Sequence, residues 1–273
     1  MTRRLRVPLV YAALLLGALA TMLPLWWMLA ASFMPTGEAN AFPPRWWPSH
    51  ITAEHYAALF ERLNLARSAA NSLLVAAAST AIALALNAMA GYAFAKLHFA
   101  GRDRIFRFLV AALVIPAQIG MLPLFLLLRQ LGLVNTYWGV IVPGMASIYG
   151  IFMVRQYALS IPDTMLDAAR IDGASELRIF WELVLPSCRP VLVTLGLFTF
   201  MGAWNDFLWP LVVLTDGDMY TLPVALANLV GEHVQDTELM MAGAVLTVLP
   251  VVLLFIALQR FYIAGVMSGS LKE

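Results

Sequence analysis

The sequence has few charged residues and almost no cysteine. Only 12% of its 273 residues are Asp, Glu, Lys or Arg, about half of the roughly 25% typical of soluble domains. Because the formal net charge is +1, no basic surplus points to nucleic-acid binding. A single cysteine, Cys188, excludes an intrachain disulfide and a cysteine-based zinc site. These absences exclude a soluble protein and make redox chemistry an unlikely class.

Sequence motifs of common catalytic sites are also missing. A phosphate-binding loop requires Gly-x-x-x-x-Gly-Lys-Ser/Thr, but neither lysine, Lys96 or Lys272, is preceded by glycine. The four histidines have no metal-ligand spacing and are interpreted as solvated loop residues: His50, His55, His98 and His233. An integral-membrane enzyme would need several His, Asp or Glu residues grouped at one face. We therefore expect no catalytic residue, no metal and no cofactor in this chain.

Long uncharged runs dominate the sequence instead. Hydrophobic residues make up 62% of the chain, and the mean hydropathy is +0.81. A run of about 18 or more apolar residues predicts a membrane-spanning helix. The sequence therefore predicts an all-α integral membrane protein with six transmembrane helices, at about residues 7–34, 68–95, 106–129, 137–157, 188–214 and 239–260.

The first uncharged run has two competing interpretations. Ala18-Leu19-Ala20 resembles a signal-peptide cleavage site, and Thr2-Arg3-Arg4 resembles a twin-arginine signal. The apolar run, however, continues to Phe33, and a signal peptide has an apolar core of only about 7–15 residues. We predict an uncleaved membrane anchor that follows a cytoplasmic segment, residues 1–6.

The positions of Lys and Arg predict the orientation of the chain, because cytoplasmic loops hold an excess of them. With the amino terminus inside, only four of the 17 Lys and Arg residues lie in outer segments: Arg45, Arg62, Arg67 and Arg129. The outer segment between the fifth and sixth spans is purely acidic: Asp216, Asp218, Glu232, Asp236 and Glu238. The sequence therefore predicts that both termini are cytoplasmic.

The first outer loop, about residues 35–67, is predicted to be periplasmic and to contain one short helix. Its prolines disfavour regular structure, whereas Thr52 can cap a helix that places four apolar residues on one face: Tyr56, Leu59, Phe60 and Leu63. Trp46 and Trp47 in the same loop are typical of an interfacial aromatic belt. A platform that stacks against sugar rings is the alternative.

Residues 161–186, between the fourth and fifth spans, predict two short cytoplasmic helices. Pro162 suits a first helical turn, and Gly173 can adopt the left-handed conformation that ends a helix. Ser175 can cap a second helix with an apolar face: Leu177, Phe180, Trp181 and Val184. Periodicity alone leaves open whether this pair lies on the membrane surface or docks on a partner protein.

The spacing within this loop closely resembles the cytoplasmic loop of binding-protein-dependent ABC importer permeases. That pattern is Glu-Ala-Ala, three residues, Gly, nine residues, Ile, one residue and Leu-Pro. The matching residues are Asp167, Ala168, Ala169, Gly173, Leu183, Leu185 and Pro186. Aspartate replaces the glutamate and leucine replaces the isoleucine. The resemblance implies that the loop docks into a cleft of a separate ATPase subunit and transmits its nucleotide-driven movement.

Similarity to maltose-type sugar permeases extends over nearly the whole chain. It includes Asn-Ser-Leu at 71–73, Ala-Gly-Tyr-Ala-Phe-Ala-Lys at 90–96, Leu-Val-Asn-Thr-Tyr-Trp-Gly at 133–139, Trp-Asn-Asp-Phe-Leu-Trp-Pro at 204–210 and Gln-Arg-Phe-Tyr at 259–262. The resemblance implies a type I ABC importer permease fold in a bacterial inner membrane, surrounded by lipid. It also implies a second homologous permease, two ATPase subunits that hold ATP and Mg²⁺, and a periplasmic solute-binding protein that delivers a carbohydrate or a polyol derivative. A contact of Lys272 and Glu273 with the ATPases is left open.

Asp206 is the one acidic residue that interrupts a predicted span. Charged groups inside a membrane are costly and by default indicate function, so Asp206, Asn205 and Gln118 are candidates for the translocation path. The alternative places Asp206 near the outer interface. Pro116 and Pro123 break the third span, either as cavity-lining hinges or as ordinary packed kinks.

A secondary transporter or channel that is not coupled to ATP is the main functional alternative. Such a protein would need a set of intramembrane charged residues or paired broken helices. Asp206 alone favours it.

Overall fold

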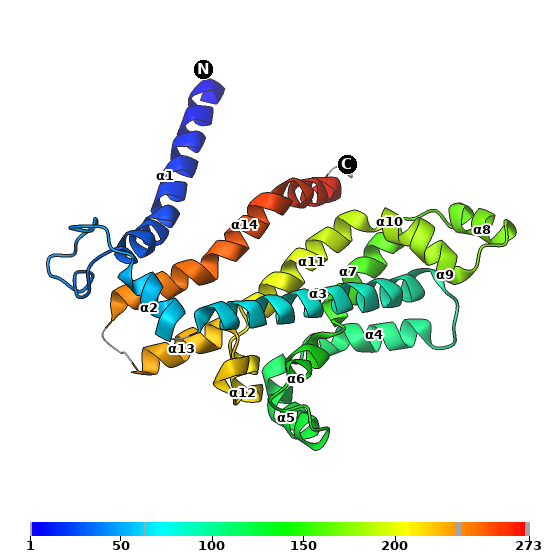
Figure 1. The fold of residues 1–273 in the computed structure, drawn as a ribbon. Coiled ribbons are helices and arrows are strands. Elements are labelled where there is room, and N and C mark those ends of the chain that lie inside the picture. Colours follow the sequence, from blue (N-terminus) through cyan, green and yellow to red (C-terminus); the bar gives the residue numbers. More distant parts are fainter. Residues whose placement is uncertain (1, 63, 233–235, 271–273) are drawn as a thin grey trace. The chain divides into compact units, whose positions relative to one another are not determined.

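The computed structural model describes residues 2–62, 64–232 and 236–270, and all regular structure within these ranges is helical (Figure 1). The elements in chain order are α1 (Thr2–Ala31), α2 (Glu54–Arg62), α3 (Leu65–Lys96), α4 (Arg102–Ala112), η1 (Ala117–Gly120), α5 (Met121–Gln130), α6 (Tyr137–Ile141), η2 (Val142–Gly144), α7 (Ile148–Ala158), α8 (Asp163–Ile171), α9 (Glu176–Ile179), η3 (Phe180–Val184), α10 (Leu185–Ser187), α11 (Arg189–Trp204), α12 (Leu208–Val213), η4 (Gly217–Met219), α13 (Leu222–Glu232) and α14 (Thr237–Ser270).

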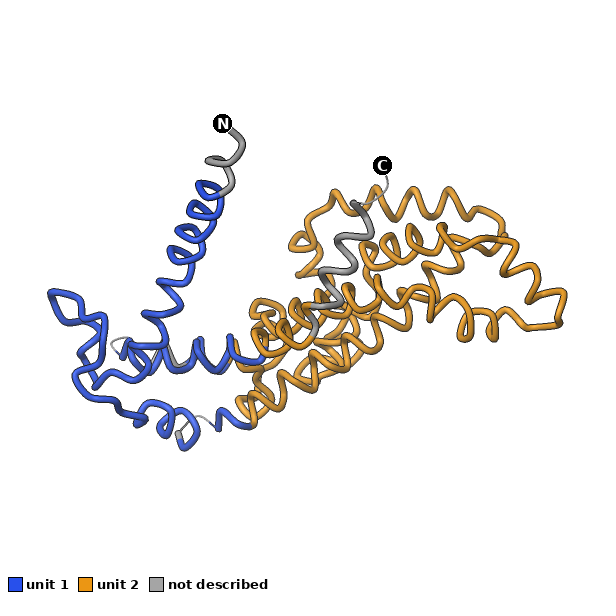
Figure 2. The backbone as a smooth tube through the Cα atoms, turned by 90° about the horizontal axis from the view of Figure 1, so that it is seen from above, with its two compact units in different colours: residues 1–66, 225–250 blue, residues 67–224, 251–273 orange. Residues whose placement is uncertain are grey.

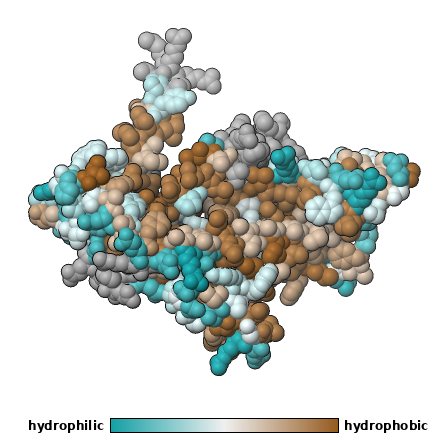
Figure 3. Space-filling model, viewed as in Figure 1, coloured by the Kyte–Doolittle hydropathy of each residue, from teal (hydrophilic) through white to brown (hydrophobic). Residues whose placement is uncertain are grey.

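The chain forms two compact units (Figure 2). Unit 1 consists of residues 1–66 and 225–250, and unit 2 consists of residues 67–224 and 251–273. Apolar side chains cover much of the visible face of unit 2 over α3, whereas hydrophilic side chains gather around α8 (Figure 3). An apolar surface of this kind is suited to contact with lipid, and α8 is suited to contact with water.

Three described helices are individually long and apolar enough to cross a membrane: Pro8–Ala31, Leu65–Lys96 and Thr237–Ala257. The number rises to as many as six if each of three bent helix pairs forms one span. These pairs are Arg102–Ala112 with Ala117–Gln130, Tyr137–Gly144 with Ile148–Ala158, and Glu176–Ser187 with Arg189–Trp204. The fold is therefore that of an all-α integral membrane protein.

The span predicted over residues 106–129, with breaks at Pro116 and Pro123, is bent by 95° between α4 and the η1–α5 segment. Pro116 lies at the break and has an extended ψ of 129°. A continuous helix is disfavoured there because proline lacks an N–H and restricts the residue before it. Pro123 lies in the first turn of α5, where an N–H would have no helical acceptor, so it causes no second break. The segment predicted as one helix over 188–214 is likewise divided into α11 and α12.

In unit 1, the segment between α1 and α3 makes polar contacts with helix ends. Thr52 Oγ1 accepts a hydrogen bond from the Glu54 N–H at 3.3 Å, so the predicted cap of α2 is confirmed. Leu59 is buried, but Phe60 is 49% exposed, and Leu63 lies outside the described residues. His55 corrects the prediction of a solvated histidine: it is buried, with Nε2 2.8 Å from the Met34 carbonyl oxygen.

Unit 2 is built around a core that joins α3, α7, α11 and the 161–186 loop. Gly91 of α3 permits the close approach of α7, because a Cβ atom there would lie 2.7 Å from the Val154 Cβ. Asn87 of α3 accepts a hydrogen bond at 3.0 Å from the N–H of Ser147, the residue that caps α7. α3, which also contacts the 161–186 loop, is thus fixed to α7 by both packing and hydrogen bonding.

Candidate functional site

The turn after α8 has the hydrogen bonds of a Schellman motif. The N–H of Gly173 donates to the Arg170 carbonyl at 3.1 Å, and the N–H of Ala174 donates to the Ala169 carbonyl at 2.9 Å, which is the pattern that closes a helix. Gly173 has a φ of +80°, a value that disfavours residues with a Cβ atom. The predicted left-handed glycine is therefore confirmed, and it fixes the direction in which the chain leaves α8.

A second helical segment begins directly after this turn. Ser175 caps it by accepting a hydrogen bond from the Arg178 N–H, as predicted. The segment is α-helical over α9, π-helical over η3 and α-helical again over α10. Of the predicted apolar face, Phe180 and Val184 are buried, whereas Leu177 and Trp181 are 64% and 55% exposed, which leaves part of that face open to a partner or to lipid.

Lys96, the last residue of α3, holds the start of α8. Its side chain is 5% exposed, and its Nζ atom donates to the Ile161 carbonyl and to Asp163 Oδ1, both at 2.6 Å. The Lys96 ammonium holds the pKa of the Asp163 carboxyl below its ordinary value, through the hydrogen bond and then through charge attraction. Asp163 is therefore an anion at neutral pH, and the pair connects α3 to α8.

A second connection between α3 and the loop is made by Glu176, which also binds Arg170. The Tyr92 hydroxyl of α3 donates to Glu176 Oε2 at 2.5 Å, and Glu176 Oε1 accepts from Arg170 Nε at 2.7 Å. Arg170 Nη1 also donates to Asp167 Oδ1 at 2.8 Å. These hydrogen bonds, from Glu176 first and Asp167 second, raise the pKa of the Arg170 guanidinium above its ordinary value. Tyr92 and Lys96 both lie in the 90–96 motif, but nothing in the sequence indicated that they bind the 161–186 loop.

The seven predicted loop residues divide into two groups in the structure. The exposed group is Asp167, Ala168, Gly173 and Pro186, and the half-buried group is Ala169, Leu183 and Leu185, which packs against the core of unit 2. Two further apolar residues of α8 face solvent: Ile171 is 86% exposed and Met165 is 36% exposed. The exposed surface of α8 therefore includes Met165, Ala168 and Ile171 beside Asp167.

Gln118 and Asp206 line one cavity, of about 470 Å³, in unit 2. The other lining residues are Val75, Ser79, Ala117, Met121, Leu124, Val140, Pro143, Gly144, Thr199, Gly202, Ala203, Leu208 and Trp209. Asn205 is absent from this lining and donates to the Met201 carbonyl at 2.8 Å. The structure thus brings together two of the three predicted path residues.

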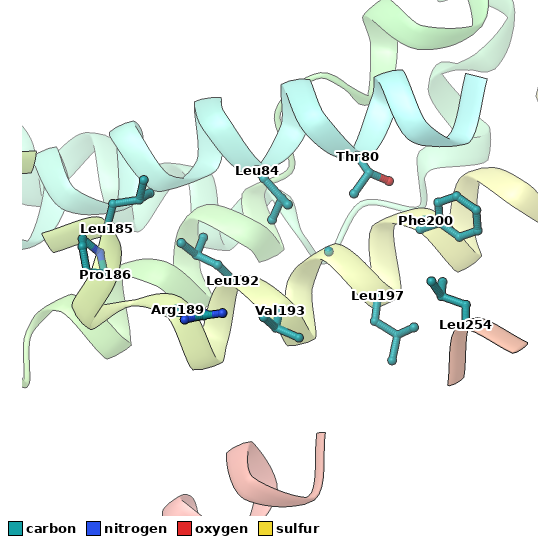
Figure 4. A pocket seen from close by; sticks show the side chains of 11 residues that line it. Thr80, Leu84, Leu185, Pro186, Arg189, Leu192, Val193, Leu197, Phe200 and Leu254 are labelled. Carbon is teal, nitrogen blue, oxygen red and sulfur yellow. The ribbon is translucent and has the colours of Figure 1, made fainter. Parts of the chain in front are cut away.

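Another cavity of unit 2, of about 610 Å³, lies between α3 and α11 (Figure 4). Its side chains are almost all apolar, and Arg189 is the one charged residue that lines it. In the described part of the chain, no three His, Cys, Asp or Glu side chains are grouped closely enough to hold a metal ion.

Residues 87–267 match the family described as binding-protein-dependent transport system inner membrane component. The chain is 39% identical over 258 residues to the arabinooligosaccharides transport system permease protein of Halalkalibacterium halodurans, which covers 93% of this chain and 92% of the relative. It is 31% identical to the lactose transport system permease protein of Rhizobium radiobacter, with 99% of both chains covered.

Among solved structures, the fold is similar to a chain in the crystal structure of a bacterial ABC transporter involved in the import of the acidic polysaccharide alginate. The TM-score is 0.84 and the sequence identity is 24%, with 96% of this chain and 99% of that chain covered. This likeness concerns the fold. The family match spans about two thirds of the sequence and includes the 161–186 loop, Gln118 and Asp206. The chain therefore belongs to the binding-protein-dependent transport system inner membrane components, the permease family of ABC importers.

Proposed function

We propose that the chain is the permease subunit of an ABC importer that moves a carbohydrate across a bacterial inner membrane. The observation that carries this proposal is the family match over residues 87–267. The carbohydrate class rests on relatives named for the transport of arabinooligosaccharides, lactose and diacetylchitobiose. ATP hydrolysis on separate subunits supplies the energy, and those subunits bind ATP and Mg²⁺.

The proposed topology has six spans with both termini in the cytoplasm. The bent pairs Arg102–Ala112 with Ala117–Gln130 and Tyr137–Gly144 with Ile148–Ala158 then count as one crossing each, in addition to the three single helices. The sixth crossing begins at α11, which leaves α9 outside the membrane. The excess of Lys and Arg in the segments placed inside supports this orientation. It puts α8 and α9 on the same side as the ATPases.

The exposed surface of α8 is proposed as the place where an ATPase subunit docks. Ala168 lacks the bulk that would keep a partner away, and Met165 and Ile171 offer apolar area. The Schellman turn and the Lys96 contacts hold α8 as a rigid body against α3. A rigid short helix can transmit a movement of the bound partner.

The assembly proposed around this chain contains a second homologous permease, two ATPase subunits and a periplasmic solute-binding protein. A likeness in fold to a methionine ABC transporter, with a TM-score of 0.55 and 18% identity, supports the importer architecture. The cavity with Gln118 and Asp206 is proposed as part of the translocation path, because its polar side chains can bond to hydroxyl groups.

Two measurements test the proposal. ATP-driven, vanadate-sensitive sugar uptake into membrane vesicles should require this chain, whereas uptake that persists without ATP would favour a secondary transporter or channel. An ATPase subunit should also co-purify with the wild-type chain and be lost with Ala168→Trp. The matched control is Ala57→Trp, at an alanine of α2 that is also exposed and lies outside the 161–186 loop. Equal recovery of the ATPase with both variants would contradict docking on α8.

A further inference from the structure

A basic cavity lies at the junction of α3 and α4, apart from the loop and the polar cavity described above. Its volume is about 620 Å³, and it is lined by His98, Phe99, Gly101, Arg102, Asp103, Arg104 and Arg107. Three arginines and one acidic residue, Asp103, therefore line the same cavity. We propose that this cavity binds the phosphate headgroup of an anionic phospholipid.

The charges of the cavity are only partly neutralised within the described part of the chain. Arg102 Nε is 3.2 Å from Asp103 Oδ1, and its Nη1 donates to the Leu97 carbonyl at 3.1 Å. Arg107 Nε donates to the Asp103 carbonyl oxygen at 3.2 Å, which leaves its positive charge without an anion. Arg104 is exposed and forms no ion pair or hydrogen bond with the described residues. With one carboxylate against three guanidinium groups, the cavity has two positive charges to offer an anion.

The start of α4 adds to this positive potential. α4 has 11 residues, and Gly101 before it provides no side-chain cap, so the first N–H groups of the helix are open to an acceptor. The positive end of the helix dipole lies at the same place. These features add to the attraction for an anion that the three arginines provide.

Apolar side chains beside the arginines decide between a lipid and a free phosphate. Phe108 is 75% exposed, Ile105 is 46% exposed and Phe99 is 42% exposed. A free phosphate ion cannot cover this apolar surface, whereas the acyl chains of a lipid can lie along it. Basic pockets at the ends of transmembrane helices are suited to anionic headgroups. The combination of charge and apolar surface therefore favours an anionic phospholipid.

The matched pair Arg104→Gln and Arg129→Gln tests this site. Both arginines are exposed and form no hydrogen bond or ion pair in the described part of the chain, so each variant removes one positive charge without breaking an observed contact. The full chain, with its co-purifying subunits, is delipidated in detergent and titrated with phosphatidylglycerol or phosphatidylcholine. Native mass spectrometry then counts the bound lipids.

The wild type should bind phosphatidylglycerol in preference to phosphatidylcholine. Arg104→Gln should weaken that binding about fivefold, as expected for one basic residue near an anionic membrane surface, and Arg104→Lys should retain most of it. Arg129→Gln should match the wild type. High salt should reduce the difference between Arg104→Gln and the wild type, because screening weakens exposed charge interactions.

Three outcomes would overturn the proposal. Equal lipid binding by Arg104→Gln and Arg129→Gln would show that the cavity is only a solvated basic surface. No preference of the wild type for phosphatidylglycerol would do the same. In a second arm, inorganic phosphate is added to the delipidated protein, and binding of phosphate without retention of the lipid would identify a free anion as the ligand instead.

Discussion

Substitution of Gly173 should separate two reasons for a glycine in the loop. The φ of +80° at Gly173 lies in the left-handed region, which costs an ordinary residue roughly 1–2 kcal/mol. No atom of the described chain lies within 4 Å of a Cβ atom built there, so alanine adds strain but no internal clash. Asparagine adopts this conformation more readily than alanine, although it is larger.

The expected order of ATP-driven uptake follows from the conformational cost. A penalty of about 1–2 kcal/mol lowers the ratio of intact to opened turn about 5–30-fold. Opening the turn would break the bonds from the Gly173 and Ala174 N–H groups and redirect the chain after α8. Uptake into vesicles should therefore be lower for Gly173→Ala than for Gly173→Asn, at equal amounts of inserted protein.

The opposite order would refute this reasoning. If an ATPase surface packs directly on Gly173, size decides, and Gly173→Ala should be more active than Gly173→Asn. If both variants equal the wild type, neither the conformation nor the bulk at this position matters to coupling. Immunoblots of the membrane fraction supply the control for insertion.

Four other substitutions have defined outcomes. Lys96→Met should reduce uptake more than Asp163→Asn, because it removes both 2.6 Å bonds of the Lys96 ammonium, whereas Asp163→Asn leaves the bond to the Ile161 carbonyl in place. Gly91→Ala should lower stability by about 1–3 kcal/mol, since its Cβ would lie 2.7 Å from a side-chain carbon of α7; thermal unfolding in detergent measures this. Asp206→Asn should change uptake or substrate range, because Asp206 lines the polar cavity.

Each of these outcomes has a result that would contradict it. Equal uptake by Lys96→Met and Asp163→Asn would mean that the carbonyl bond does not hold α8 in place. An unchanged unfolding temperature for Gly91→Ala would show that α3 and α7 can separate at no cost. Unaltered transport by Asp206→Asn would favour a position of this residue at the outer interface, outside the path.

Local chemistry is what made parts of the loop predictable from sequence. The left-handed Gly173 and the caps Ser175 and Thr52 depend on a few adjacent residues, and those residues are all visible in the sequence. The loop spacing also pointed to the family that matches residues 87–267. The class of fold was also predictable, because the length of the apolar runs indicates membrane-spanning helices.

Contacts between distant segments explain what sequence analysis did not predict. His55 is buried because its ring meets the Met34 carbonyl, 21 residues earlier, and Lys96 is buried because its acceptors lie 65 and 67 residues later. The π-helical segment over Phe180–Val184 is a feature that no 3.6-residue periodicity anticipates. Residue type alone would place both a histidine and a lysine at the surface.

The contacts of α3 give the proposed coupling a mechanical basis. Tyr92 and Lys96 are four residues apart and therefore lie on one face of the helix, where Lys96 holds the start of α8 and Tyr92 holds the start of α9. Toward its other end, α3 contributes Val75 and Ser79 to the cavity with Asp206. Lys96 lies 17 residues after Ser79, a helical distance of about 25 Å at 1.5 Å per residue, with no proline in between. A displacement of α8 that preserves these bonds must therefore displace α3, and through it one wall of the cavity.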